Sequence, residues 1–187
     1  MTEKQVELST QIRTMMEKTA KLQLEYWKLI ADLSSWHFWI VILMLLLPLI
    51  VLFFYIDKRN ALLLGFFGLN FHIWFAYANK ILIGLGLIEY PYPVFPFIDS
   101  FSLDASFVPI AFMLLYQWTI KHNKNIYLYS ILLSAILAFV FKPILVNLDL
   151  FHMFKGVNYF HLFLFYMAFF IASKLITNLF LWLQRGK

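Results

Sequence analysis

The stretch WHFWIVILMLLLPLIVLFFYI, residues 36–56, decides the class to which this protein belongs. It contains no Asp, Glu, Lys or Arg, and it is long enough for a membrane-crossing helix, which needs about 20 apolar residues. It stops at Asp57-Lys58-Arg59-Asn60, a polar turn that is only long enough to join two antiparallel helices. We therefore expect one transmembrane helix here and a second directly after it.

The overall composition agrees with a membrane protein. Of the 187 residues, 63% are hydrophobic and 13% are charged, and the mean hydropathy is +0.77. A soluble domain of this size cannot bury so much apolar surface. The net charge of +5 is spread unevenly along the chain, which indicates membrane topology and no nucleic-acid partner. The partner that the composition predicts is the lipid bilayer.

Sites for cofactors and metals are not indicated by the sequence. It has no cysteine, which excludes disulfides and thiolate metal sites. Asp149, His152 and His161 are too loosely spaced for a metal site and are predicted to be solvated loop residues. We assign no catalytic residue, no cofactor and no metal from the sequence.

Four further apolar segments follow residues 36–56, and together they predict an all-α fold. The expected fold is a polytopic transmembrane helix bundle of about five spans, preceded by an amphipathic or heptad helix in residues 1–35. The bundle, residues 36–187, has its spans at about 36–56, 61–82, 105–120, 126–146 and 159–182. An odd number of spans places the two termini on opposite sides of the membrane.

The distribution of Lys and Arg predicts the orientation. Basic residues gather at the two short turns and the C-terminus, at Lys58, Arg59, Lys121, Lys124, Arg185 and Lys187. Since cytoplasmic loops carry the excess of Lys and Arg, we expect a multi-pass protein of the cell membrane with a cytoplasmic C-terminus. Lys18, Lys21 and Lys28, before the first span, favour the opposite orientation.

The N-terminal segment carries a seam of apolar residues at alternating spacings of four and three. Two interpretations stay open: an amphipathic helix on the bilayer surface or on the bundle, or a coiled coil with a second copy or a partner helix through residues 5–36. The candidate association seam is Leu8, Ile12, Met15, Leu22, Tyr26, Leu29 and Leu33.

The segment GLIEYPYPVFPFIDSFSLD, residues 86–104, cannot form one regular helix because its three prolines remove backbone donors. It is predicted to be a lid-like loop at the membrane edge, with Tyr90, Tyr92, Phe95 and Phe97 at headgroup depth. Asp104 is predicted to be a helix N-cap. The alternative is that Glu89, Asp99 and Asp104 face a cavity and bind a cation or a polar headgroup.

Polar residues inside the spans are candidates for function, because each is costly in hydrocarbon. Gly65, Gly68, His72 and Asn79 share one helical face, which predicts close packing with interhelical hydrogen bonds, or a proton relay or ligand site through His72. Lys142 and Lys174 are predicted to extend their ammonium groups to the interfaces, and the alternative for both is a functional site.

A succession of motifs between Lys58 and Trp182 resembles a known family. The motifs are Gly86, Glu89-Tyr90-Pro91, Phe95-Pro96, Asp104, Pro109, Tyr116-Gln117 and Phe141-x-Pro143, followed by an aromatic-rich last helix. They are similar to those of a family of uncharacterised multi-pass membrane proteins of endospore-forming Bacillus- and Clostridium-type bacteria. The resemblance implies about five helices and a place in the bacterial envelope, and it implies no activity.

Three functional hypotheses follow. The first is a non-enzymatic component of an envelope or spore assembly that recruits a partner through its N-terminal helix. The second is a small transporter or channel, which requires His72, Asn79, Lys142 and Lys174 to converge on one cavity. The third is a membrane-embedded enzyme acting on a lipid or isoprenoid, which requires the three loop acids to converge with His72 or Lys174.

Overall fold

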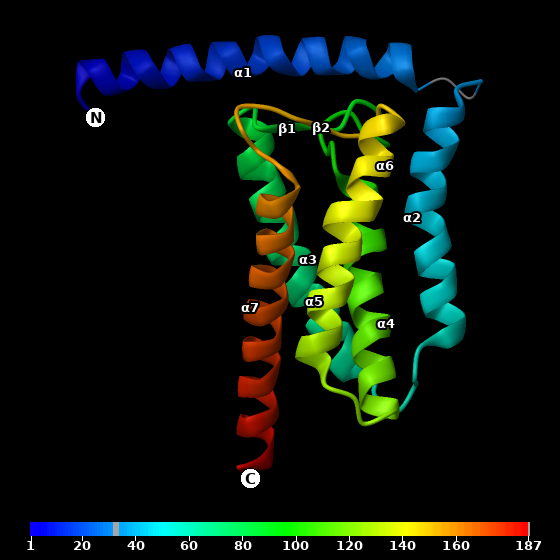
Figure 1. The fold of residues 1–187 in the computed structure, drawn as a ribbon. Coiled ribbons are helices and arrows are strands. Elements are labelled where there is room, and N and C mark those ends of the chain that lie inside the picture. The colour runs from blue at the N-terminus through cyan, green and yellow to red at the C-terminus, as the bar shows by residue number, and fades with distance from the viewer. Residues whose placement is uncertain (32–33, 187) are drawn as a thin grey trace.

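The computed structural model describes residues 1–31 and 34–186, and it confirms the all-α helix bundle. Within these described residues, five helices are long and apolar enough to cross a membrane, and they stand side by side, with a sixth long helix, α1, lying across one end (Figure 1). The helices are α1 Glu3–Ile30, α2 Trp36–Tyr55, α3 Ala61–Gly84, α4 Val108–Lys121, α5 Ile126–Ile136, α6 Lys142–Asn147 and α7 Tyr159–Arg185. Two short strands, β1 Ile88–Glu89 and β2 His152–Met153, and two π-helical segments, η1 Leu103–Phe107 and η2 Leu137–Phe141, complete the fold.

The five spans lie close to their predicted positions. The third begins slightly earlier than predicted, because η1 continues into α4 as one helix, Leu103–Lys121. The fourth runs through α5, η2 and α6 as Ile126–Asn147. The N-terminus and C-terminus lie at opposite ends of the bundle, as an odd number of spans requires (Figure 1).

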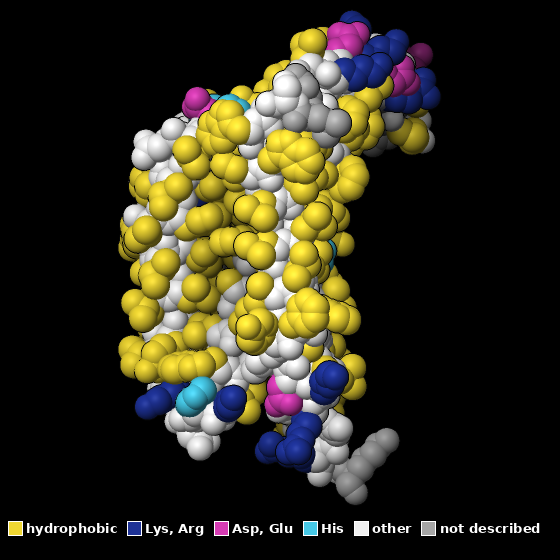
Figure 2. Space-filling view, turned by 90° about the vertical axis from the view of Figure 1, so that its right-hand side faces the viewer, with side chains coloured by type: hydrophobic (Ala, Val, Ile, Leu, Met, Phe, Trp, Pro, Cys, Tyr) yellow, Lys and Arg dark blue, Asp and Glu magenta, His cyan; other side chains and the backbone are white. Residues whose placement is uncertain are grey.

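The two ends of the bundle differ in structure. We call the end with the turns at residues 57–60 and 122–125 and the C-terminus the turn side, and the end with α1 and the two long loops the loop side (Figure 1). Figure 2 shows an apolar belt between them, with charged side chains gathered at each end. This distribution is what a bilayer requires of a spanning protein.

Two π-helical breaks lie side by side in the bundle, and they share a sequence pattern, Leu-x-x-x-Phe-x-Pro, at residues 103–109 and 137–143. Proline has no N–H for the carbonyl four residues earlier, which disturbs the helix. In both segments the residue before proline bonds five residues back, Val108 N–H to the Leu103 carbonyl and Lys142 N–H to the Leu137 carbonyl. The rings of Phe107 and Phe141 stack between the segments at 4.5 Å.

The middle of the bundle is filled by aromatic rings. Phe67 and Phe71 of α3, Phe112 of α4 and Phe170 of α7 are fully buried, and the Phe71 and Phe112 rings stack at 4.4 Å. We call these four residues the phenylalanine layer. The close packing predicted at the glycines holds for Gly68, where a Cβ would overlap the Met113 sulfur, but not for Gly65, which has open space around it.

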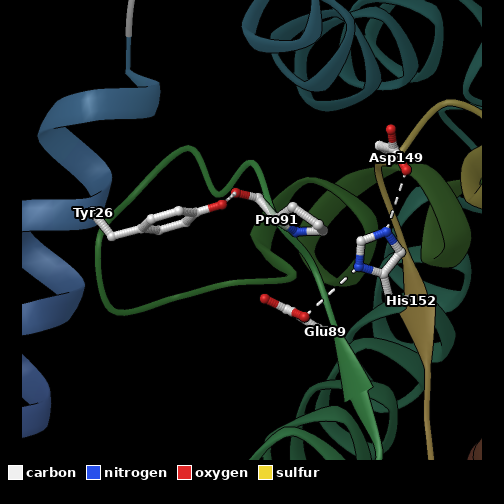
Figure 3. Close-up of polar contacts among 5 residues, drawn as sticks. All are labelled: Tyr26, Glu89, Pro91, Asp149 and His152. Carbon is white, nitrogen blue, oxygen red and sulfur yellow. Dashed lines mark hydrogen bonds and ion pairs between the residues drawn. The ribbon is translucent and has the colours of Figure 1, made fainter.

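The loop side is closed by pairing between distant segments. β1 pairs with β2 in antiparallel register, Glu89 opposite His152, and the His152 ring lies 3.7 Å from a Glu89 oxygen and 3.5 Å from an Asp149 oxygen (Figure 3). This short sheet was not predicted, because two residues a strand leave no periodic pattern. It joins the proline loop to the segment between α6 and α7.

Helix α1 rests on the proline loop through one face. Tyr26 Oη donates to the Pro91 carbonyl at 3.0 Å (Figure 3), and Trp27 Nε1 donates to the Val94 carbonyl at 3.2 Å. Gln23 and Ile30, on the same face, are partly buried. Apart from Leu33, which lies outside the described residues, the predicted seam is exposed: Leu8, Ile12, Met15, Leu22, Tyr26 and Leu29.

Candidate functional site

The carboxylate of Asp104 lies in the interior of the loop-side half of the bundle and is 5% exposed. Its Oδ1 accepts a hydrogen bond from Asn79 Nδ2 at 2.6 Å, and its Oδ2 accepts one from Ser100 Oγ. The predicted N-cap role is wrong, because Asp104 lies inside η1 and its side chain turns towards α3 and Ser100 instead of capping the helix. Both oxygens are therefore bound by neutral donors.

The ammonium of Lys142 is buried opposite this carboxylate. The residue is 1% exposed, and Nζ donates to Tyr90 Oη at 3.0 Å and lies 3.5 Å from the centre of the Phe151 ring. The predicted extension to the interface is wrong, because the loop-side segments that carry Tyr90 and Phe151 cover the lysine. The π-type hydrogen bond just before Pro143 positions Lys142 at the start of α6.

The two opposite charges interact without touching. No ion pair joins these two described residues, so the attraction between opposite charges acts across the side chains that separate them. Tyr90 and Asn79 lie between them, and burial raises the pKa of Tyr90 well above its ordinary value. Tyr90 is therefore neutral at ordinary pH. Its hydroxyl oxygen accepts a hydrogen bond from Lys142 Nζ, and the proton stays on the lysine. Tyr90 is 7% exposed, so its ring packs inside the protein, and its depth in the membrane stays a prediction.

A small cavity adjoins the group. Its volume is about 10 Å³, close to the room that one water molecule needs, and Asn79, Tyr90, Lys142 and Tyr166 contribute its polar atoms. Tyr166 Oη is buried and has no hydrogen-bond partner among the described residues. This hydroxyl is a free polar group within reach of the cavity.

His72 supports the backbone of η1. Its Nδ1 lies 2.6 Å from the Asp104 carbonyl oxygen, and because a carbonyl only accepts, the Nδ1 atom carries the proton. His72 therefore holds the backbone at Asp104 in place. This bond between α3 and η1 is one of the interhelical hydrogen bonds predicted for this helical face. We call the set His72, Asn79, Tyr90, Ser100, Asp104 and Lys142 the loop-side cluster.

Two cavities in the loop-side half of the protein are lined in part by residues of this cluster. The larger, about 310 Å³, is lined by Tyr77 and Lys80 of α3 and by Phe97, Asp99, Ser100 and Asp104. The second, about 180 Å³, lies under α1 between Gln23, Tyr26, Glu89, Tyr90 and Asp99. The three loop acids thus do face cavities, although no group of three potential metal ligands forms within the described residues.

Asp99 is shared by both cavities. Burial raises the pKa of its carboxyl group, and the nearby Lys80 charge partly opposes that shift. Asp99 therefore adds a second carboxyl group to the lining of the 310 Å³ cavity, beside Asp104.

Lys174 does not join the loop-side cluster. Its Nζ donates to Tyr116 Oη at 2.8 Å and to Asn178 Oδ1 at 2.6 Å. Asn178 lies one helical turn further along α7, and Tyr116 comes from α4. The phenylalanine layer lies between this group and Asn79, since Phe67 contacts Tyr116 on one side and Phe71 follows one turn along α3. The predicted polar residues therefore divide into two groups.

Two residues of the cluster, and Tyr166 beside it, were not among the predicted site residues. Tyr90 was assigned to the interface, and Ser100 and Tyr166 carried no functional assignment. The repeated Leu-x-x-x-Phe-x-Pro pattern is the signal that could have identified the region, because it marks two helix breaks next to the buried Asp104 and Lys142.

The chain was compared with protein-family models, with curated proteins and with solved structures, and no match was found.

Proposed function

We propose that this protein is a small membrane transporter that binds a monovalent cation or an organic ammonium group at Asp104 and releases a proton from Lys142 in exchange. The observation that carries the proposal is the pair of buried, opposite and separated charges at two adjacent π-helical breaks. A charged side chain is costly inside a membrane-spanning bundle, so such residues mark sites where ions or protons bind or move.

The charge balance supports exchange. In the proposed unliganded state, the Asp104 carboxylate and the Lys142 ammonium compensate one another. A cation bound at Asp104 would leave Lys142 as an uncompensated buried positive charge, which is strongly unfavourable. Loss of the lysine proton restores neutrality, so cation binding and proton release are coupled.

The ligand atoms favour a cation of low charge. Asp104, Ser100 and Asp99 offer a few oxygens at the inner end of the 310 Å³ cavity. Calcium requires about six to eight oxygen ligands and magnesium a near-octahedral shell. The aromatic side chains of Tyr77 and Phe97 at the same cavity suit an ammonium ligand.

The structure also supports one-sided access. The cavities that touch the cluster lie in the loop-side half of the protein, and the fully buried phenylalanine layer separates them from the turn side. The π-helical breaks at η1 and η2 supply points where the two spans could bend, because helix breaks next to binding sites are the usual hinges of transporters.

Proton release tests the proposal. Purified protein in a weakly buffered detergent solution is titrated with sodium, potassium or methylammonium chloride while the pH is recorded. We expect release of about one proton per cation bound for the parent and for Lys174→Met, and none for Asp104→Asn. Lys142→Met is expected to bind the cation without releasing a proton. Equal behaviour of the parent and Asp104→Asn would refute the proposal.

A second candidate function is assembly through α1, and the exposed seam favours it. The paired substitution Leu22→Glu and Leu29→Glu is expected to abolish cross-linking between copies or to a partner in native membranes, because it places charges in the seam. Val6→Glu with Leu24→Glu, on exposed positions outside the seam, is the matched control. Unchanged cross-linking in the seam variant would instead favour a helix that lies on the bilayer.

We further propose that the protein resides in a bacterial cell membrane with its turn side and C-terminus in the cytoplasm. The clustering of basic residues at the turns supports this orientation. A reporter that functions only in the cytoplasm should be active at the C-terminus and inactive after Ser100. The opposite pattern would reverse the orientation and leave the five spans unchanged.

A further inference from the structure

A groove at the turn side lies between α3 and α7. Its volume is about 610 Å³. One end is polar, with Arg59, Asn60 and Gln184, and the remainder is mostly apolar, with Leu62, Leu63, Phe66, Phe180 and Leu181. The groove is separate from the loop-side cluster, so no part of the cation proposal depends on it.

The electrostatics of this end favour an anion. The described turn-side residues Lys58, Arg59, Lys121, Lys124 and Arg185 are basic, and Asp57 is the acid among them. Hydrogen bonds from the Asn60 side chain and the Arg59 backbone N–H lower the pKa of Asp57 and occupy its two oxygens. The Arg59 guanidinium forms no ion pair within the described part of the chain, so it is available to an external anion.

The apolar part of the groove identifies the kind of anion. Below Arg59, the side chains of α3 and α7 line a strip in which the Phe66 and Phe180 rings lie 5.0 Å apart. A free phosphate ion makes no favourable contact with such an apolar strip. A phospholipid has a phosphate at one end and an acyl chain that can pack along the strip. Arginine presents a planar fork of donors that suits a phosphate group.

We propose that the α3–α7 groove binds an anionic phospholipid, with the phosphate at Arg59 and an acyl chain along Phe66 and Phe180. The position of the groove at the end of the apolar belt places the phosphate at headgroup depth and the chain in the hydrocarbon. The lipid would then bridge α3 and α7 at the turn side, where the groove separates them.

Thermal unfolding in nanodiscs tests the proposal. The parent is reconstituted in phosphatidylcholine alone and with a fraction of phosphatidylglycerol that has the same acyl chains. We expect the phosphatidylglycerol to raise the melting temperature of the parent and of Lys124→Gln, which loses the same charge outside the groove. Arg59→Gln should lose at least half of the rise.

Two further arms separate a specific site from general attraction. Leu181→Trp keeps the charge and fills the groove, and it should also lose at least half of the rise. The melting temperatures of both groove variants in phosphatidylcholine alone show whether they are folded. Equal responses of Arg59→Gln and Lys124→Gln, or a rise produced by inorganic phosphate in phosphatidylcholine, would overturn the proposal.

Discussion

Lys142 and Lys174 both lie inside predicted spans, and their surroundings differ. Lys174 is partly exposed and is bound by Asn178, one turn away on its own helix, and by the Tyr116 hydroxyl. Lys142 is 1% exposed, and its partners come from the proline loop, the α6–α7 segment and, at longer range, η1. The hydrogen bonds of Lys174 to nearby residues account for a structural role. The buried position of Lys142, with partners from distant segments, indicates a functional role in addition.

The strongest test of this difference is removal of the loop-side charges. Asp104→Asn leaves the buried Lys142 without its counter-charge and should lower the free energy of unfolding by about 3–5 kcal/mol. The double variant Asp104→Asn with Lys142→Met should recover much of that loss, because no uncompensated charge remains. Thermal unfolding in detergent measures both. Additive losses in the double variant would show that the two charges do not act as a pair.

Substitution of Lys174 should have a smaller effect. Lys174→Met removes hydrogen bonds to Tyr116 and Asn178 and should reduce stability by about 1 kcal/mol, because the site is partly exposed. The measurement is the same thermal unfolding, with Asn178→Ala as a second probe of the pair. A clear rise in melting temperature would mean that the pair contributes nothing.

The smallest effect is expected at Asp99, where burial raises the pKa of the carboxyl group. The folded protein then holds this proton more tightly than the unfolded chain, so ionisation of Asp99 reduces stability as pH rises above the ordinary value of 3.8. Asp99→Asn should melt slightly higher than the parent at pH 7, and the difference should vanish as pH falls towards 3.8. A variant that melts lower at pH 7 would contradict this.

The sequence predicted the bundle more accurately than the site. Long apolar segments such as residues 36–56 identify spans without reference to the rest of the chain, because the bilayer imposes their length. The partners of Lys142 could not be predicted in the same way. Tyr90 and Phe151 reach it because β1 pairs with β2, and a pairing of two residues on each strand leaves no sequence pattern.

Asp104 shows a different reason for failure. A residue ahead of a predicted helix is most often a cap, and the predicted start at residue 105 made Asp104 such a residue. The π-helical turn before Pro109 extends the helix to Leu103 and turns the carboxylate inwards to Asn79. Asn79 and Lys142 were selected as costly polar residues in spans, and they lie in the cluster. Lys174 was selected on the same ground and lies outside it.

Proton flux in liposomes tests the central claim most directly, that Asp104 and Lys142 together exchange a cation for a proton. The parent, Asp104→Asn, Lys142→Met and Lys174→Met are reconstituted with a pH-sensitive dye inside, and a sodium, potassium or methylammonium gradient is imposed. We predict proton flux against the cation gradient for the parent and for Lys174→Met, and none for Asp104→Asn or Lys142→Met. Loss of flux in Lys174→Met to the same extent as in Lys142→Met, or no flux in the parent with any of the three cations, would contradict the account.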